Sequence, residues 1–314
     1  MSKRVVFMGT PEFAVPSLQA LIGSAYELVA VYTQPDRKAG RGQNVAFSPV
    51  RQLALSQGLE VVQPDSLKAT GTVDKLAGLA PDVIVVAAFG QLLPPEVLAS
   101  PKFGCLNVHP SLLPKYRGAS PIATAILQGD KVTGVTIMLL DAGMDTGPVL
   151  SRKEVPVSDD DTTGSLAANL ARVGAQLLME TLPLWLDGRI KPQPQEESRA
   201  TYSKVITKAD GEMDWRLPAP DLWRRVRAFD PWPGCFTLWR GKRLKLIKVA
   251  LLPGGRSGKP GKVIALSPPA TAAVGVETGD GVLGLLSVQL EGKREMSADE
   301  FVRGQRDFVG SSLL

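Results

Sequence analysis

The sequence predicts a two-domain α/β protein, with an N-terminal Rossmann-like domain that has a parallel-rich sheet and a C-terminal β-barrel domain of the OB type. At 314 residues the chain is longer than one compact core usually is. Its first two-thirds alternate short apolar runs with helical patterns, and its last third has β-rich runs between Gly and Pro turns. The expected boundaries are 1–188 for the first domain, 189–207 for a linker and 208–314 for the second domain.

Six apolar runs are the expected strands of the first domain, and several are apolar at nearly every position, as strands buried on both faces should be. They cover residues 4–8, 28–33, 61–63, 82–88, 105–109 and 135–140. Apolar residues at helical spacing predict helices at 13–21, 49–57, 72–79 and 122–128. A long helix is expected at 162–185, because the Asp and Thr residues at 159–163 favour a helix start.

A polar, irregular stretch at 188–212 has the composition of a linker that leads toward the second domain. A helix is expected at 221–229. Five short runs then predict the strands of a small barrel, at 236–239, 244–251, 261–266, 272–278 and 282–289. Five strands with a basic surface are compatible with an OB-type fold, a common nucleic-acid module.

The positive charge of the chain lies in its last third. The formal net charge is +5; residues 1–206 hold 19 basic and 19 acidic residues, whereas residues 207–314 hold 17 and 12. Residues 231–276 contain no acid and eight bases, which are Arg240, Lys242, Arg243, Lys245, Lys248, Arg256, Lys259 and Lys262. Such a pattern is typical of a polyanion-binding surface, although a merely solvated face is the alternative. Trp232, Phe236 and Trp239 lie among these bases and could stack on nucleotides or belong to the core.

Composition and motifs disfavour several classes of protein. Cys105 and Cys235 are too few for a disulfide framework, and with a single histidine in the chain we expect no metal site. The first predicted strand–helix turn lacks the G-x-G-x-x-G glycines. Pro11 and Glu12 in that turn remove an N–H donor and add a negative charge where a pyrophosphate would bind, which disfavours an NAD dehydrogenase.

The sequence also lacks the patterns of secretion and membrane insertion. The apolar run near the start ends at Gly9, which is too short for a signal peptide, and no run approaches the roughly 20 apolar residues of a membrane span. We therefore expect a soluble, cytoplasmic protein. Nothing in the sequence suggests an obligate interface, so a monomer is expected.

The single histidine, His109, is the candidate for imidazole chemistry. Asn107, two residues earlier, should project on the same side of an extended strand. Histidine titrates nearest to neutrality, and an amide NH₂ can donate to a developing oxyanion. A base and an oxyanion donor would therefore share one face. The loop that follows, 111–121, is rich in Pro and basic residues, as ligand-binding loops after strands often are; a merely structural histidine is the alternative.

A second informative segment is the acidic loop after the strand expected at 135–140. It contains Asp141 and Asp145. Loops that follow parallel strands converge at one edge of the sheet, so we expect one of these carboxylates to meet His109. For Asp141 we favour a structural role in the Gly-rich turn.

Several motifs together resemble the folate-dependent formyltransferases over essentially the whole chain. They are Asn107-x-His109-x-Ser111-Leu112-Leu113-Pro114, Arg117-Gly118-Ala119-x-Pro121, Asp145-Thr146-Gly147, Gly9-Thr10-Pro11-Glu12-Phe13-Ala14, Gln34-Pro35-Asp36-Arg37-x-Ala39-Gly40-Arg41-Gly42 and Phe229-Asp230-Pro231-Trp232-Pro233. The resemblance implies transfer of a formyl group from 10-formyltetrahydrofolate to the α-amino group of methionine on the initiator tRNA. The product would be the formylated initiator used in translation initiation.

The resemblance also implies roles for single residues. Asn107, His109 and Asp145 would be catalytic. Residues 111–114 would line the folate site. Arg41 would be the critical cation of a loop that enters the tRNA acceptor stem.

Two alternatives stay open. Other folate formyltransferases act on purine precursors or amino sugars, and related hydrolases act on formyltetrahydrofolate; the basic last third and the 34–42 loop favour tRNA. The second alternative is a non-catalytic RNA-binding protein, which has no physical need for Asn107, His109 and Asp145 together. The sequence does not decide whether His109 is a base or an oxyanion donor.

Overall fold

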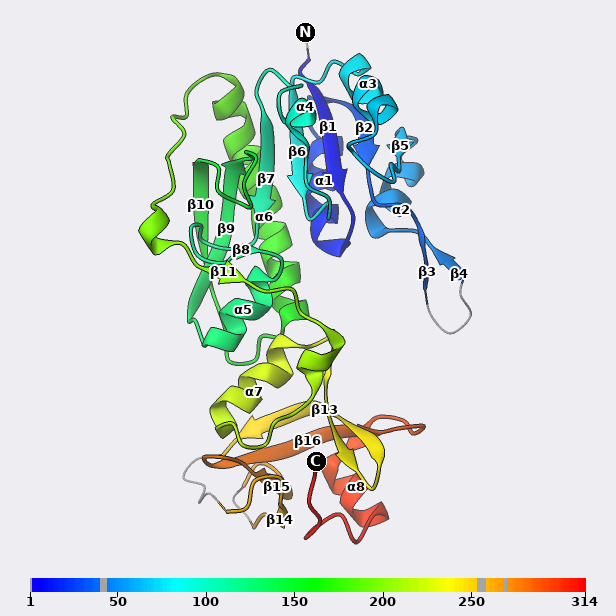
Figure 1. Cartoon of the computed structure of the whole chain (residues 1–314), viewed down its shortest axis with the longest axis vertical. Helices are drawn as coiled ribbons and strands as arrows, with labels where there is room; N and C mark the ends of the chain where they lie inside the picture. The colour runs from blue at the N-terminus through cyan, green and yellow to red at the C-terminus, as the bar shows by residue number, and fades with distance from the viewer. Residues whose placement is uncertain (1, 40–43, 253–257, 268–269) are drawn as a thin grey trace. The chain divides into compact units, whose positions relative to one another are not determined.

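The computed structural model describes residues 2–39, 44–252, 258–267 and 270–314. The chain forms two compact units (Figure 1). The first consists of Met1–Pro121, Val132–Pro156 and Leu166–Ser203, and the second of Ile122–Lys131, Val157–Ser165 and Lys204–Leu314. Two short segments from the middle of the chain thus belong to the C-terminal unit. The domain boundaries at 188 and 207 stay a prediction.

The first unit is built on a seven-stranded sheet with the strand order β10-β9-β7-β6-β1-β2-β5. The strands are β1 (Arg4–Gly9), β2 (Glu27–Tyr32), β5 (Val61–Val62), β6 (Val83–Ala87), β7 (Cys105–His109), β9 (Val132–Leu139) and β10 (Val149–Pro156). Strands β7, β6, β1, β2 and β5, which are neighbours in this order, run parallel to one another. This confirms the parallel-rich sheet. Strand β9 is antiparallel to both of its neighbours. Strand β10 was not predicted from the sequence. Its polar residues alternate between half-buried and exposed positions, as on an edge strand.

Helices cover both faces of this sheet (Figure 1). On one face, apolar residues of β1 and β6 form a buried cluster with Leu76 of α3 (Thr70–Gly78) and Val97 of α4 (Pro95–Leu98). On the other face lies α6 (Thr163–Leu186), where Gly174 permits a close approach, because a Cβ there would lie 2.7 Å from Val108 of β7. The unit also contains η1 (Glu12–Ala14), α1 (Val15–Ile22), α2 (Pro49–Ser56) and the hairpin of β3 (Arg37–Ala39) and β4 (Asn44–Ala46).

The segment predicted as a linker is bound to the first unit as far as Ser203. It contains η2 (Glu197–Arg199) and β11 (Tyr202–Ser203), and β11 pairs in parallel with β8 (Arg117–Gly118). Gln193 and Val149 exchange main-chain hydrogen bonds of 2.8 and 2.9 Å. These contacts tie the segment to the loop after β7 and to the start of β10.

The second unit is an antiparallel sheet with the order β12-β13-β16-β15-β14, with β17 paired to β16. Its elements are α5 (Pro121–Gln128), η3 (Lys208–Gly211), α7 (Ala219–Ala228), β12 (Cys235–Trp239), β13 (Lys242–Leu251), β14 (Val263–Ala265), β15 (Val274–Glu277), β16 (Val282–Leu290), β17 (Met296–Ser297) and α8 (Ala298–Gly304). The C-terminal end of the chain hydrogen-bonds to both outer strands of this order, β12 and β14. Leu314 hydrogen-bonds to Leu238 of β12, and Ser311 accepts from Val263 of β14. This is the OB-like arrangement that the sequence predicted.

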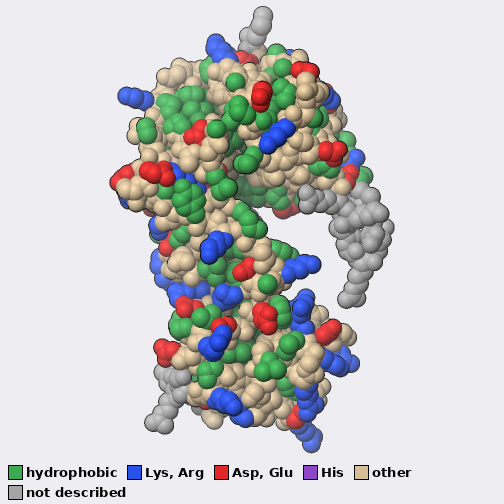
Figure 2. Space-filling model, in the orientation of Figure 1, with side chains coloured by type: hydrophobic (Ala, Val, Ile, Leu, Met, Phe, Trp, Pro, Cys, Tyr) green, Lys and Arg blue, Asp and Glu red, His purple; other side chains and the backbone are tan. Residues whose placement is uncertain are grey.

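The aromatic and basic residues of this unit separate into core and surface. Trp239 is buried and packs edge-to-face against Phe301 and Phe308, with ring centroids 5.6 and 5.3 Å away. Trp232 is 52% exposed. Along β13, the exposed bases Lys242, Arg243, Lys245 and Lys248 alternate with buried leucines and valine. Figure 2 shows Lys and Arg side chains on the visible surface of this unit. Arg256 lies outside the described residues.

Two general features bear on the kind of site that the fold can hold. Among the described residues, no three His, Cys, Asp or Glu side chains gather as a metal site would require. Within the same described ranges, no helix is both long enough and apolar enough to cross a membrane.

Candidate active site

The end of strand β7 places Asn107 and His109 on one face of the sheet. The register pairs Val86 with Asn107 and Ile84 with Cys105, so these residues share the face that α3 and α4 cover. Alternation along the strand then puts His109 on that face and Val108 on the opposite one. The predicted juxtaposition of amide and imidazole therefore exists.

The His109 imidazole is buried, with a polar neighbour at each ring nitrogen. Nε2 lies 3.1 Å from the carbonyl oxygen of Tyr116, and Nδ1 lies 3.7 Å from Oδ1 of Asp145. The side chain of His109 is only 5% exposed. Because a carbonyl oxygen can only accept, Nε2 must carry the proton. In the neutral ring, Nδ1 then presents its lone pair toward the carboxylate of Asp145.

Asp145 reaches His109 by a route that differs from the expected one. The expectation that both loops leave parallel strands at one edge of the sheet is wrong. Strand β9 is antiparallel to β7, with Leu139 opposite Leu106 and Thr136 opposite His109. The loop between β9 and β10 must therefore run back along β7. Gly147 permits this, since a Cβ there would overlap the carbonyl oxygen of Leu139.

The two carboxylates of this loop have different surroundings. Asp145 has a positive φ of 54°, and its Oδ2 accepts a 2.8 Å hydrogen bond from the main-chain N–H of Gly118. Asp141 is exposed, and its Oδ1 accepts from Gly143 N at 3.0 Å and from Thr146 Oγ1 at 2.7 Å. Asp141 thus ties the loop to itself, which is the structural role favoured from the sequence.

The electrostatic setting lowers the pKa of His109 below its ordinary value of 6.5. Burial is the largest cause, because it disfavours the charged imidazolium. The carboxylate of Asp145 and the hydrogen bond to Tyr116 oppose the shift but do not cancel it. At neutral pH the imidazole is therefore uncharged and able to accept a proton at Nδ1.

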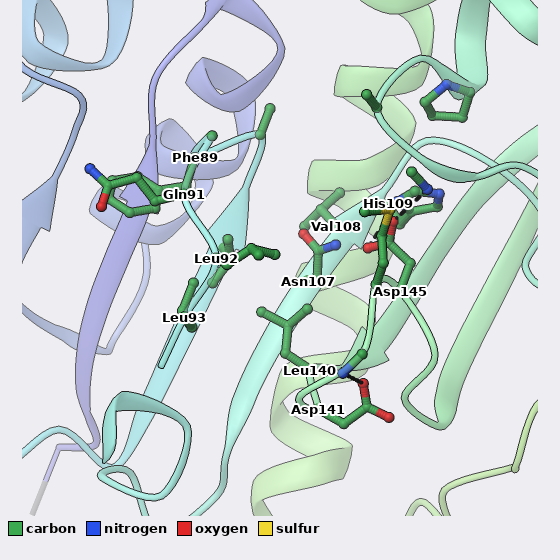
Figure 3. A pocket seen from close by; sticks show the side chains of 18 of the residues that line it. Phe89, Gln91, Leu92, Leu93, Asn107, Val108, His109, Leu140, Asp141 and Asp145 are labelled. Carbon is green, nitrogen blue, oxygen red and sulfur yellow. Dashed lines mark hydrogen bonds and ion pairs between the residues drawn. The ribbon is translucent and has the colours of Figure 1, made fainter. Parts of the chain in front are cut away.

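A cavity of about 420 Å³ opens beside these residues. It is lined by residues 88–93, 107–110, 118–119 and 140–145, together with Val86, Leu98 and Pro121. In Figure 3, the amide of Asn107 lies between residues 89–93 on one side and the pair of His109 and Asp145 on the other. Leu92, at 75% exposure, is an apolar side chain presented to solvent in this wall. The cavity is of the size that small-molecule ligands occupy in proteins.

Some residues singled out from the sequence lie elsewhere. Residues 111–114 do not line this cavity: Ser111 is fully buried, and Leu113 packs against Met138 and Val149. Thr136 Oγ1 accepts from Leu113 N at 3.1 Å, so β9 holds this turn. Arg41 lies outside the described residues.

The apolar wall at 88–93 was not predicted from the sequence. Its signal was weak, because the segment follows a buried strand with no charged residue to mark it. The Gln91 side chain fixes the wall in place. Its Oε1 accepts from Leu67 N and its Nε2 donates to Pro64 O, both at 3.1 Å.

Comparisons with known proteins agree over both units. The family model described as formyl transferase matches residues 3–182, and the model described as formyl transferase, C-terminal domain, matches residues 205–306. Among solved structures, the sugar 3N-formyltransferase WlaRD, determined in the presence of dTDP and 5-N-formyl-THF, has a TM-score of 0.66 at 20% identity. The matched region covers 94% of this chain and 99% of the WlaRD chain. This likeness shows the fold.

Relatives of known name are similar over the full length of the chain. The methionyl-tRNA formyltransferase of Caldanaerobacter subterraneus subsp. tengcongensis is 45% identical over 311 residues, which are 99% of each chain. The methionyl-tRNA formyltransferase of Roseiflexus sp. is 47% identical over 314 residues, which are 100% of this chain and 96% of the relative. The chain therefore belongs to the formyl transferase family and, within it, to the methionyl-tRNA formyltransferases.

Proposed function

We propose that the protein transfers the formyl group of 10-formyltetrahydrofolate to the α-amino group of methionyl initiator tRNA, with Asn107, His109 and Asp145 as the catalytic residues. The observation that carries these roles is the meeting of a neutral imidazole, a carboxylate and an amide at one wall of the cavity. The folate supplies the formyl group as an amide of its N10 nitrogen. In the balanced reaction, the amine nitrogen bonds to the formyl carbon, the bond from that carbon to N10 breaks, and one proton passes from the amine to N10.

Asn107 is proposed as the oxyanion donor. Attack on the formyl carbon gives a tetrahedral intermediate with a negative oxygen, and the amide NH₂ of Asn107 can donate to that oxygen. Preorganised donors of this kind contribute about 10²–10³ in rate. The position of Asn107 inside strand β7 supports the assignment, because the ladder to β6 and β9 fixes its main chain.

His109 is proposed as the base that moves the proton. Its Nε2–H is already donated to Tyr116, so Nδ1 is the nitrogen left to accept the amine proton. This favours a base over an oxyanion donor, the choice that the sequence left open. Asp145 would stabilise the imidazolium formed at that step, since its carboxylate lies 3.7 Å from Nδ1. The same nitrogen can then return the proton to N10.

The cavity fits a folate in size and chemistry. A pterin is flat with apolar faces, and residues 89–93 and Leu140 supply apolar walls beside the catalytic residues. Residues 111–114, which the family resemblance assigns to the folate site, would then act by supporting the turn next to the cavity. The contacts of Leu113 with β9 support this indirect role in folate binding.

The tRNA would be held by surfaces outside the cavity. The exposed bases of β13 match the polyanion character of tRNA, and the resemblance assigns the acceptor stem to Arg41. Remote contacts of this kind can align the amine with the formyl carbon, and well-aligned reactants reach effective molarities of about 10⁵–10⁸ M. A monomeric protein of the cytoplasm is part of the same proposal.

The test is a formyl-transfer assay with the purified chain, 10-formyltetrahydrofolate and methionine-charged initiator tRNA. Uncharged initiator tRNA and an amino sugar nucleotide are the control acceptors. Product that depends on the methionyl group, and that is lost in His109→Ala, is the expected result. Formylation of the amino sugar alone would redirect the function to the other branch of the family.

A further inference from the structure

The segment 193–203, here called the strap, holds both loops that enclose His109. At one end, Gln193 pairs with Val149 at the close of the acidic loop. At the other, Ser203 Oγ donates to Arg117 O at 3.1 Å and accepts from Ser120 N at 3.0 Å. The strap contributes no residue to the lining of the cavity. Its effect on chemistry would therefore be indirect.

Gln195 is the strap residue that contacts the acidic loop through its side chain. Its Nε2 donates to the carbonyl oxygen of Asp145 at 2.8 Å and to that of Gly147 at 2.7 Å. Both protons of the amide nitrogen are thus used on one loop. They hold the main chain of Asp145 at the point where its φ of 54° lies in the left-handed region, which non-glycine residues seldom occupy.

Arg117 orients the Gln195 amide. Its Nε donates to Oε1 of Gln195 at 3.1 Å, so the amide oxygen faces the guanidinium and the nitrogen faces the loop. Arg117 is itself fully buried, and Nη1 donates to both carboxylate oxygens of Glu197 at 2.9 Å. A buried charge is expensive to leave unpaired, so Glu197 fixes Arg117 and Arg117 fixes Gln195.

The strap also holds the carbonyl group that accepts from His109. Thr201 Oγ1 accepts from Tyr116 N at 2.9 Å, and Thr201 O accepts from Arg117 N at 2.9 Å. Tyr116, like Asp145, has a positive φ, of 57°. Both partners of the imidazole are therefore residues in the left-handed region whose main chains the strap restrains.

We infer that Gln195, oriented by Arg117, is a positioning residue for formyl transfer that fixes Asp145 against Nδ1 of His109, and that Thr201 fixes Tyr116 against Nε2. The inference rests on the proposed catalytic roles of His109 and Asp145. Gln195 touches neither the cavity nor the imidazole, so its removal should change turnover while leaving substrate binding intact.

The test uses the full chain with Gln195→Met, which keeps the length and neutral charge of the side chain and removes both hydrogen-bonding groups. Because His109 is the only histidine, ¹⁵N-histidine labelling reports its ring nitrogens without overlap. We expect the pKa of His109 to fall below the wild-type value, since Asp145 no longer raises it. We also expect kcat to fall by about 10- to 100-fold, because small misplacements of reacting groups lower the rate by such factors. KM for both substrates should be nearly unchanged.

The matched control is Gln193→Met in the same segment, where the side chain is exposed and the contacts to Val149 are through the main chain. It should retain the wild-type pKa and kcat. A Gln195→Met protein whose imidazole pKa is unchanged or raised, or whose kcat equals that of the control, overturns the inference.

A second variant keeps the test decisive if Gln195→Met does not fold. Thr201→Val removes the hydroxyl that accepts from Tyr116 N, and we expect it to lower the pKa of His109 as well, because the Tyr116 hydrogen bond raises that pKa. Wild-type values in Thr201→Val would then refute the role of the strap. The imidazole signal needs no substrate, so a failure of the proposed activity would appear separately, as a wild-type chain without formyl transfer.

Discussion

The two units use their polar side chains in opposite ways. In the first unit, His109 and Arg117 are buried, and each is hydrogen-bonded to particular partners. In the second unit, the bases of β13 stand on an exposed face, and buried leucines behind them fill the core. A buried polar group must be satisfied and is therefore fixed, whereas an exposed cation is screened and mobile. Changes in the first unit should alter turnover, and changes in the second should alter affinity.

The largest effect is expected for His109→Ala. Loss of the base should lower kcat by about 10²–10⁴, since no other imidazole can take its place. Folate affinity, measured by calorimetry, should change little, because the apolar wall of the cavity is untouched. Turnover near the wild-type value in His109→Ala would show that His109 is not the base, and that the catalytic site has been assigned wrongly.

Asn107→Ala should follow, with a loss of about 10²–10³ in kcat from removal of the oxyanion donor. Asn107→Asp is a sharper variant, because it keeps the shape and replaces the donor by an acceptor. We expect it to be at least as slow in the single-turnover rate of formyl transfer. An active Asn107→Asp protein would exclude donation by this side chain.

The carboxylate pair offers a comparison within one loop. Asp145→Asn removes the charge that faces His109, and it should lower kcat by at least about 10-fold. Asp141→Asn keeps an oxygen that can accept from Gly143 and Thr146, so it should cost at most about 1 kcal/mol in the free energy of unfolding. Turnover rates and urea unfolding of the two variants decide this. Equal losses of kcat would erase the distinction between the two carboxylates.

The pH dependence of kcat should show an acid limb set by His109. Its pKa in the folded chain lies below 6.5, so kcat should fall only when the pH drops through that lower value. In the unfolded chain the imidazole takes up its proton near 6.5. The stabilising contribution of neutral His109 is therefore complete above that pH and is lost as the pH falls toward the folded pKa. An acid limb centred above 6.5 would contradict the buried, neutral imidazole.

The smallest effect is expected for single bases of β13. Lys245→Ala should weaken tRNA binding and reduce the slope of log affinity against log salt by about 0.7–0.9, if Lys245 neutralises one phosphate. The matched control is Lys75→Ala in the first unit, where the exposed lysine pairs with Glu60. Filter binding over a range of salt concentrations gives both slopes. A wild-type slope in Lys245→Ala would mean that this face of β13 does not contact RNA.

Much of the first unit could be predicted from its sequence because the signals are local. Buried parallel strands read as apolar runs, and the predicted strand at 105–109 coincides with β7. The shared face of Asn107 and His109 follows from the two-residue period of a strand, which needs no knowledge of the neighbours. The basic run of the second unit was visible for the same reason, since alternation along β13 is a local pattern.

The tertiary structure decided what depends on residues far apart in the chain. Nothing in the sequence of β9 marks it as antiparallel to β7, and this direction sets the path by which Asp145 returns to His109. The tautomer of His109 depends on Tyr116, whose position depends on Thr201, a residue 85 positions later. Gln195 looked like part of a polar linker. Sequence fixes what each segment prefers by itself, but these contacts exist only because buried polar groups must find partners, and the folded chain alone determines which partners are near.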